Sequence, residues 1–272
     1  MKSITRRILA TAAAAPIAVA LTAPAAHAEP SPVKVDFSSC PDRLPVGADP
    51  AQWWCNIFVV GGGSMKLGNI TQPLTEPMTI SLASGPDRAS KQVQIVTLTG
   101  KPMTVPGGAL GIPGTENLPG VKLQAQPKYV GNFGLSVDDS GNLRSTLDLR
   151  IKLINALMGN TCYIGTTKAP IKLNTTVDPA SLTPYDNDIV GLTLNDNAYS
   201  VPGASGCGLL TPVANLRGGL PSASGQNTAS MRTYLATKVY TDLYPALRKK
   251  ARSKPATNRM PFNLPSSVLR RK

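Results

Sequence analysis

Residues 145–155, Ser-Thr-Leu-Asp-Leu-Arg-Ile-Lys-Leu-Ile-Asn, decide the fold class of this chain. Apolar and charged side chains alternate along the stretch: Leu147, Leu149, Ile151 and Leu153 against Asp148, Arg150 and Lys152. Successive side chains of a strand point to opposite faces of a sheet, so this period of two predicts one face in a core and one in water. The stretch is therefore predicted to be a half-buried β-strand.

Turn-forming residues precede this strand, and further apolar runs surround it. The segment 138–142, Asp-Asp-Ser-Gly-Asn, favours a turn, which makes 132–137 the predicted partner strand. Gly and Pro separate the other runs at intervals of about ten to twenty residues, which is typical of all-β domains. Further strands are predicted at residues 56–60, 78–83, 93–99, 121–125, 171–176 and 189–194. We therefore expect an all-β fold, mainly an antiparallel sandwich or partly closed barrel.

Two stretches leave the organisation of the body open. Residues 106–120 hold five glycines and three prolines, so they form either a long surface loop or a linker between two small β lobes. We favour one domain over residues 29–245, because all-β domains of about 200 residues are common. Residues 228–244 carry apolar residues at every fourth position, as in a helix, and an alternation with threonines, as in a strand. A single C-terminal helix is favoured there, because the segment is long and Pro245 would end it.

The first 28 residues have the parts of an export signal. A positively charged start precedes an alanine-rich apolar run at residues 8–23 and the triplet Ala26-His27-Ala28, which suits signal peptidase. The run is shorter than a membrane span needs. Arg6-Arg7 leaves both Sec and twin-arginine export open. We expect cleavage near Ala28, no transmembrane span in the mature chain, and a secreted or cell-wall-associated protein.

Four cysteines remain after this cleavage: Cys40, Cys55, Cys162 and Cys207. An even number in an exported chain predicts disulfides, and four cysteines allow three pairings. We favour Cys40–Cys55 and Cys162–Cys207, because each closes a local loop. In the chain-entropy account, loops of roughly 15 and 45 residues would stabilise by about 3 and about 4 kcal/mol. The sequence has no Cys-x-x-Cys spacing and no histidine partner, which argues against a redox or metal-binding role.

The excess positive charge is concentrated at the C-terminus. Cleavage leaves 25 of the 28 basic residues against 15 acidic ones. Residues 29–231 hold 14 of each, whereas residues 232–272 hold 11 basic residues and only Asp242. Because prolines interrupt residues 246–272, that segment is predicted to be a disordered polybasic tail. Its basic residues are the predicted polyanion-binding set: Arg248, Lys249, Lys250, Arg252, Lys254, Arg259, Arg270, Arg271 and Lys272.

This tail is either a solvated segment that aids solubility or a tether to a polyanion. Basic residues near an anionic membrane contribute about 1 kcal/mol each, so nine would hold a protein on a surface without a folded binding site. The expected partners are anionic cell-wall polymers or lipid headgroups. Nucleic acid is not expected, because Phe262 is the tail's only aromatic residue for base stacking and the chain is exported.

Catalytic signatures are weak. Cleavage would remove the only histidine, and with it Ser-His-Asp triads, Cys-His dyads and His-ligated metals. The motif Ser31-Pro-Val-Lys34 matches the Ser-x-x-Lys pattern, but no Lys-Thr-Gly follows it. The glycines at 61–63 lack the Lys-Ser/Thr of a phosphate-binding loop, so a turn is predicted there. We therefore assign no catalytic residue, no cofactor and no metal ligand.

Paired carboxylates are the catalytic option that remains without histidine, because glycoside hydrolysis needs two acids. The pairs are Asp186 with Asp188 and Asp138 with Asp139, both in segments where aspartate usually caps turns. A surface calcium site using Asp186, Asp188 or Asp196 is a further option, although residues 186–191 fail the EF-hand pattern at its fifth position.

Trp53 and Trp54 precede Cys55 and would face opposite ways in an extended segment. One indole is therefore expected over the disulfide and the other toward solvent, where it could stack on a sugar ring. Aromatic residues make up only 5% of the chain, which is few for a carbohydrate-binding face. Packing in the core is the favoured role of these residues.

Four stretches carry a resemblance to a known family. They are residues 153–165, with Cys162-Tyr-Ile-Gly165, residues 170–176, residues 195–208, with Pro202-Gly-Ala-Ser-Gly-Cys-Gly208, and residues 219–228. They resemble an uncharacterised family of exported actinobacterial proteins that has no assigned activity. The resemblance covers residues 145–230 well and the N-terminal half loosely, and the basic tail departs from the family pattern. It implies export and agrees with a Cys162–Cys207 bond, and it brings no catalytic residue.

Taken together, these features predict an exported, non-enzymatic protein. We expect it to be associated with the cell envelope or to bind a surface through its basic tail. The alternative is a secreted glycan hydrolase that works through two carboxylates.

Overall fold

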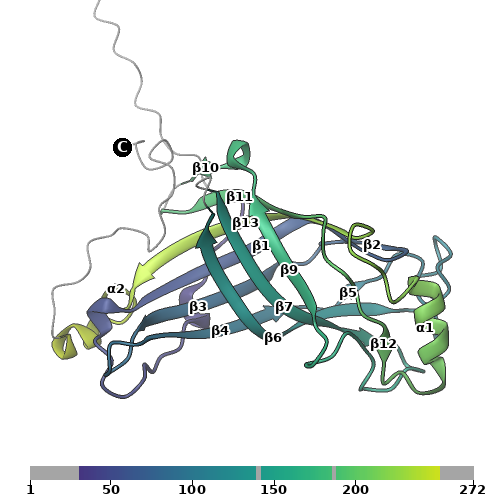
Figure 1. Cartoon of the computed structure of the whole chain (residues 1–272), viewed down its shortest axis with the longest axis horizontal. Helices are drawn as coiled ribbons and strands as arrows, with labels where there is room; N and C mark the ends of the chain where they lie inside the picture. The colour runs from purple at the N-terminus through teal and green to yellow at the C-terminus, as the bar shows by residue number, and fades with distance from the viewer. Residues whose placement is uncertain (1–30, 139–141, 186–187, 252–272) are drawn as a thin grey trace, which may run out of the picture.

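The computed structural model describes residues 31–138, 142–185 and 188–251 (Figure 1). Its strands form one 13-stranded sheet, in which every pairing is antiparallel. The strands are β1 Trp54–Leu67, β2 Ile70–Pro73, β3 Met78–Pro86, β4 Gln92–Gly100, β5 Met103–Thr104, β6 Gln124–Val137, β7 Leu143–Ile154, β8 Tyr163–Ile164, β9 Ile171–Val177, β10 Thr183–Pro184, β11 Val190–Asp196, β12 Ala204–Ser205 and β13 Thr228–Val239. This confirms the expected all-β fold.

Helical segments are short in the described part of the chain. The α-helices are α1 Thr211–Gly218 and α2 Tyr240–Leu243, and the 3-10 helices are η1 Phe37–Ser39, η2 Pro50–Gln52, η3 Pro179–Ser181, η4 Gly208–Leu210 and η5 Pro245–Lys250. None of them is long and apolar enough to cross a lipid bilayer.

The long strands follow one another around a curled sheet, a half-barrel, in the order β6-β7-β9-β11-β13-β1-β3-β4. The short strands pair with individual members of this path: β2 with β1, β5 with β6, β8 with β7 and β10 with β11, while β12 pairs with β8. One edge of β7 pairs first with β9 and then with β8, while its other edge pairs with β6. Strands β4 and β6 are therefore the two long edge strands, and the curl brings them near each other (Figure 1). The rings of Phe58 on β1 and Phe133 on β6 lie 5.6 Å apart across the interior, although these strands are far apart in the sheet.

The inside of the curl is an apolar core. Leu147, Leu149, Ile151 and Leu153 of the opening stretch all belong to it, while the charged residues between them lie half-buried on the outer face. On β1, Phe58 and Val60 join the same core. The period of two therefore predicts the inward face of β7 correctly.

A second apolar cluster covers the outer face of β1, β3 and β13. It consists of Cys40, Trp53, Cys55, Ile57, Val59, Ala83, Ile189, Tyr234, Ala236 and Tyr240. The segment before β1 and the segment after β13 pack against it, with Phe37, Leu44 and Leu247 partly buried. The two ends of the described chain thus meet on the convex side of the sheet.

Both expected disulfides are present. Cys40 is bonded to Cys55 and joins the N-terminal segment to β1, with a Cα–Cα distance of 6.2 Å. Cys162 is bonded to Cys207 and joins the segment before β8 to the segment before α1. No cysteine in the described chain is free.

The helix expected over residues 228–244 is wrong for most of its length. Residues 228–239 form β13, a central strand between β1 and β11, and only Tyr240–Leu243 is helical. Met231, Thr233 and Leu235 are buried on its inner face. The apolar residues at every fourth position are part of the period-two alternation of this strand. Hydrogen bonding of β13 to β1 on one edge and to β11 on the other favours the strand over the helix.

The turn expected at residues 61–63 is also wrong, because β1 continues through these glycines. A β-bulge lies between Val60 and Gly62, where the register with β13 shifts by one residue. Gly63 has a φ of +109°, and a Cβ there would lie 2.0 Å from the Ser230 carbonyl oxygen. The glycines serve a bulged strand and a close backbone approach.

The other predicted segments have mixed outcomes. Most predicted strands are present: 56–60 lies in β1, 78–83 in β3, 93–99 in β4, 132–137 in β6 and 171–176 in β9. The strand predicted at 145–155 is β7, which ends one residue earlier, at Ile154. The strand predicted at 189–194 is β11, which begins one residue later, at Val190. The strand predicted at 121–125 begins only at Gln124. Residues 106–120 are a loop between β5 and β6, which pair with each other.

Candidate ligand-binding site

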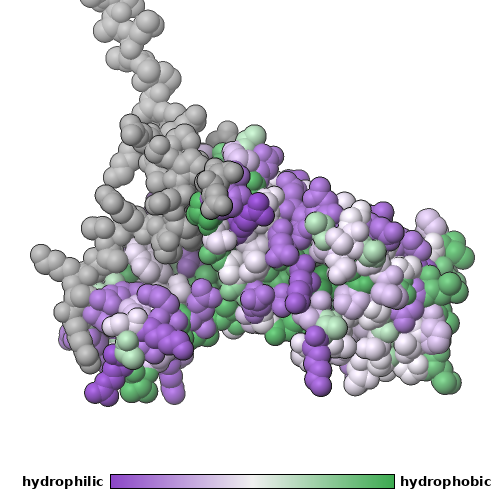
Figure 2. Space-filling view, viewed as in Figure 1, coloured by the Kyte–Doolittle hydropathy of each residue, from purple (hydrophilic) through white to green (hydrophobic). Residues whose placement is uncertain are grey.

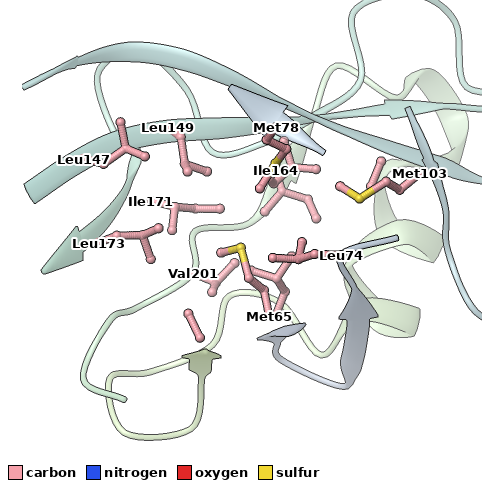
Figure 3. Close-up of a cluster of buried hydrophobic side chains, with 14 of the residues drawn as sticks. Met65, Leu74, Met78, Met103, Leu147, Leu149, Ile164, Ile171, Leu173 and Val201 are labelled. Atoms are coloured by element: carbon pink, nitrogen blue, oxygen red, sulfur yellow. The ribbon is translucent and has the colours of Figure 1, made fainter. Parts of the chain in front are cut away.

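The curled sheet encloses an apolar cavity of about 60 Å³. For comparison, one water needs roughly 10–15 Å³ in the same measure, so the cavity exceeds the space of a single water. Its walls come from β1, β2, β3, β4, β5, β6, β7, β9, β11 and β13. Figure 3 shows Met65, Leu74 and Met78 facing Leu149 and Leu173 across this interior. No lining residue carries a charge.

Four methionines line the cavity: Met65, Met78, Met103 and Met231. Each is at least nine-tenths buried. Methionine has a flexible, unbranched and polarisable side chain, so it adapts to guests of different shape more readily than leucine or isoleucine does. The cavity is therefore bounded in part by side chains that can rearrange around an apolar guest.

The sheet is closed unevenly along the seam between β4 and β6. Near Gly100 the seam is joined, because Gln126 on β6 donates from Nε2 to the Gly100 carbonyl at 2.7 Å, and β5 pairs with the start of β6. No backbone hydrogen bond links β4 to β6 in the described chain. Leu98 on β4 is half-buried and Pro127 on β6 is buried, and both line the cavity. The seam is thus the part of the wall with the weakest connection.

One polar side chain of the lining has an unusual environment. Gln72 lies on β2 and is only 4% exposed. Its Nε2 donates to the carbonyl oxygens of Pro73 at 2.9 Å and Thr104 at 3.2 Å. Its Oε1 has no hydrogen bond partner among the described residues. An unpaired buried acceptor is unusual, because buried polar groups nearly always have a hydrogen bond partner.

The end of the molecule that carries α1 exposes many apolar side chains. Seven of the nine large hydrophobic residues exposed in the described chain lie here, and we call them the apolar end: Leu110, Ile112, Leu118, Leu157, Leu209, Val213 and Leu216. Figure 2 shows hydrophobic residues gathered at this end. Leu209 is 98% exposed and Leu216 is 85% exposed.

Contacts between three chain segments build the apolar end. Arg217 on α1 reaches the carbonyl of Pro106 at 3.4 Å, which places the helix beside the loop at 106–120. Asn155 donates to the carbonyls of Gly120 and Lys122, which places the turn after β7 beside the same loop. The Cys162–Cys207 bond lies between this turn and α1.

The predicted polyanion-binding residues lie only partly within the described chain. Arg248, Lys249 and Lys250 form the end of η5, at the end of the molecule opposite α1 (Figure 1). Arg248 is paired with Asp242 at 3.2 Å. Arg252, Lys254, Arg259, Arg270, Arg271 and Lys272 lie outside the described residues, as does the predicted signal peptide.

The carboxylates considered for catalysis do not form an acidic pair in the described chain. Asp138 pairs with Arg144 at 2.9 Å and caps its own turn. Asp196 is buried and accepts from the backbone of Asn174 and Ala198. Asp188 is exposed, and Asp139 and Asp186 lie outside the described residues. No group of three or more metal-ligating side chains occurs among the described residues.

The two tryptophans and the Ser-x-x-Lys serine, also considered from the sequence, lie in packed or locally bonded positions. Trp53 is fully buried beside the Cys40–Cys55 bond and donates from Nε1 to the Pro86 carbonyl at 2.9 Å. Trp54 begins β1 and is half-buried. Ser31 of the Ser-x-x-Lys motif bonds to the backbone of Val33.

Sequence reasoning missed the cavity and Gln72. The signal for Gln72 was present, because Ile70, Gln72 and Leu74 share one side of an alternating segment and all three are buried. A glutamine at an inward position of such a pattern needs a partner inside the core. The cavity itself depends on how distant strands meet, and no local pattern encodes that.

Comparisons with known proteins found no matching family model, no matching curated protein and no matching solved structure.

Proposed function

We propose that this chain binds an apolar ligand, such as an acyl chain, inside its curled sheet, and that it acts as an exported, non-enzymatic protein of the cell envelope. The observation that carries the proposal is the uncharged cavity with four methionines in its wall. Ligand sites are typically concave and mostly apolar, with few polar groups. The weakly connected seam between β4 and β6 offers the guest a way in that leaves the rest of the sheet paired.

The cavity is small for a long chain, so binding must displace side chains. Four flexible methionines and the half-buried Leu98 at the seam supply that adaptability. Each buried methylene of a guest contributes about 0.8 kcal/mol, so an eight-carbon segment would gain roughly 6 kcal/mol before the costs of association. Micromolar or weaker binding is the expected range.

A cavity-filling substitution tests this proposal. Leu173→Phe adds bulk inside the cavity, whereas Lys172→Phe, its neighbour on β9, adds the same ring on the outer face. A dye whose fluorescence rises in apolar surroundings should bind the wild type and the Lys172→Phe variant, and decanoic acid should displace it. Leu173→Phe should bind at least 10-fold more weakly while keeping a folded circular dichroism spectrum. No dye binding by the wild type, or equal binding by folded Leu173→Phe, would contradict the proposal.

Export is supported by the two disulfides, which favour an oxidising compartment outside the cytoplasm. The predicted signal at residues 1–28 and the resemblance to exported actinobacterial proteins point the same way. Mass spectrometry of the N-terminus of the secreted protein tests this part, and a new N-terminus at Glu29 is expected.

Association with a lipid surface is the second function that we propose, and the apolar end supports it. Its side chains come from separate segments: the loop at 106–120, the turn after β7, η4 and the short helix α1. A fluid lipid layer accepts such separate insertions. Lys122 and Arg217 lie within this end, and its one acid, Glu116, accepts a hydrogen bond from the Gly114 backbone N–H at 2.9 Å. An anionic lipid surface therefore fits its charge.

The basic tail is the other proposed surface contact, and salt separates the two. Binding through the tail should fall steeply with ionic strength, whereas apolar insertion should persist. Co-sedimentation with anionic liposomes would compare the mature chain, a chain ending at Pro245, and Leu209→Asp/Leu216→Asp. The control is Val46→Asp, because Val46 is 94% exposed and lies outside the apolar end. Unchanged binding by both the truncated chain and the Leu209/Leu216 variant would contradict the proposed contacts.

A further inference from the structure

Gln72 is held in one orientation by its own hydrogen bonds. Both hydrogen bonds made by its amide nitrogen go to backbone carbonyls, those of Pro73 and Thr104. Rotating the amide by half a turn would place Oε1 against these two carbonyl oxygens, which would repel it. The nitrogen is therefore the donor to the wall, and Oε1 is the atom left as an acceptor.

The unused acceptor of Gln72 belongs to the cavity wall. Gln72 lines the cavity together with Met65, Leu74 and Met103, and its Oε1 is buried with no donor in reach among the described residues. The hydroxyl groups of Thr175 and Thr233, which also line the cavity, donate instead to the backbone carbonyls of Ser145 and Met231. A guest that is wholly apolar would leave Oε1 unpaired, whereas a guest with one donor would pair it.

We infer that the ligand of this cavity is an apolar chain that bears one neutral hydrogen bond donor of the O–H type, either a long-chain alcohol or a protonated carboxylic acid, which donates to Gln72 Oε1. This inference rests on the proposed function, because it names the chemistry of the same ligand. No lining residue is cationic, so an ionised carboxylate would find neither a counter-charge nor a donor at Oε1. A fatty acid would therefore bind in its protonated form.

The test compares two ligands that differ only in the donor. Dodecan-1-ol carries an O–H group, and 1-methoxydodecane keeps the oxygen and loses the donor. Displacement of the apolar dye from the wild type should show the alcohol binding roughly 5- to 30-fold more tightly than the ether, the effect of pairing a buried acceptor. Gln72→Met removes the acceptor and keeps similar bulk, so it should bind both ligands with similar affinity.

The outcomes separate this inference from the proposed function. If neither ligand displaces the dye, or the dye does not bind, the cavity is not a ligand site. If the wild type binds alcohol and ether equally, apolar binding stands and the role of Gln72 is overturned. A preference that persists in folded Gln72→Met overturns it as well.

A measurement on the wild type covers the case in which Gln72→Met fails to fold. In a ¹⁵N-resolved NMR spectrum the side-chain amide of Gln72 should shift on addition of the alcohol by more than on addition of the ether. Equal shifts would overturn the inference. Dodecanoic acid supplies a third arm, because its affinity should fall as rising pH ionises it, whereas the affinity of the alcohol should stay constant.

Discussion

Tyr199 and Tyr240 are both buried, but their hydroxyl groups have different surroundings. The Tyr199 hydroxyl lies 2.7 Å from the Lys66 carbonyl oxygen and 3.0 Å from that of Thr228, and donates to this pair. The Tyr240 hydroxyl is buried in the outer cluster with no partner among the described residues. Removing the oxygen should therefore cost stability at Tyr199 and change it little at Tyr240.

Tyr199→Phe should lower the free energy of unfolding by about 1–3 kcal/mol, because the carbonyls of Lys66 and Thr228 lose their shared donor. Tyr240→Phe should change it by less than about 0.5 kcal/mol at pH 7, because no hydrogen bond is lost. Urea unfolding of both variants measures the difference, and each is the control for the other. Equal losses would show that the two hydroxyls are equivalent.

Alkaline pH should destabilise the fold through the same tyrosines. Burial raises the pKa of Tyr199, with the Asp196 carboxylate adding to the effect, and burial also raises the pKa of Tyr240. The unfolded state loses these protons near pH 10 while the folded state retains them, so stability present below pH 10 is lost as pH rises above it. Tm should fall above pH 10, and it should fall less steeply in Tyr240→Phe. An identical fall in the wild type and this variant would contradict the assignment.

At the scale of the elements, the bulge of β1 depends on one of three consecutive glycines. Gly63 has a positive φ, and its missing Cβ makes room for the Ser230 carbonyl on β13. A Cβ added at the neighbouring Gly62 would have no other atom within 4 Å. An alanine substitution should therefore be costly at Gly63 and tolerated at Gly62.

Gly63→Ala should destabilise by roughly 3 kcal/mol or more, because it combines a left-handed backbone conformation with a clash against backbone. Gly62→Ala should stay within about 1 kcal/mol of the wild type. Thermal or urea unfolding of the pair measures both. A Gly63→Ala variant as stable as Gly62→Ala would mean that β1 and β13 can move apart here at little cost.

Local patterns predicted most strands, because a strand that turns one face to the core alternates apolar and polar residues along its length. Leu147 to Leu153 alternate with charges, so β7 is evident from its residues alone. Residues 228–239 were ambiguous because threonines alternate with apolar residues that also recur every fourth position. The pairing of β13 with β1 and β11 decides the matter, and that pairing joins segments far apart in the sequence.

At the scale of the whole molecule, the seam between β4 and β6 determines how reachable the interior is. The Gln126 bond to Gly100 joins the edge strands at one end of the seam. Neither the seam nor the cavity could be predicted from the sequence, because both depend on how far the sheet curls. The disulfides could be predicted, because each closes a local loop.

Gln126→Ala should speed the exchange of the apolar dye, because it removes the side-chain bond across the seam. A several-fold increase in the dissociation rate is expected in stopped-flow displacement, with a smaller effect on the free energy of unfolding. Gln92→Ala is the matched control, since Gln92 is exposed at the start of β4. Equal rates in the two variants would place the route to the cavity elsewhere.

The facing edges of β4 and β6 also bear on self-association. An exposed edge strand offers unpaired backbone groups to strands of other molecules, which is a route to aggregation and fibre formation. Here β6 contains Pro127, which has no backbone N–H, and two register shifts near Gly131 and Gly134. These features interrupt the regular ladder that an incoming strand would need. The arrangement that leaves the interior reachable for a small guest therefore makes the same edge a poor template for polymerisation.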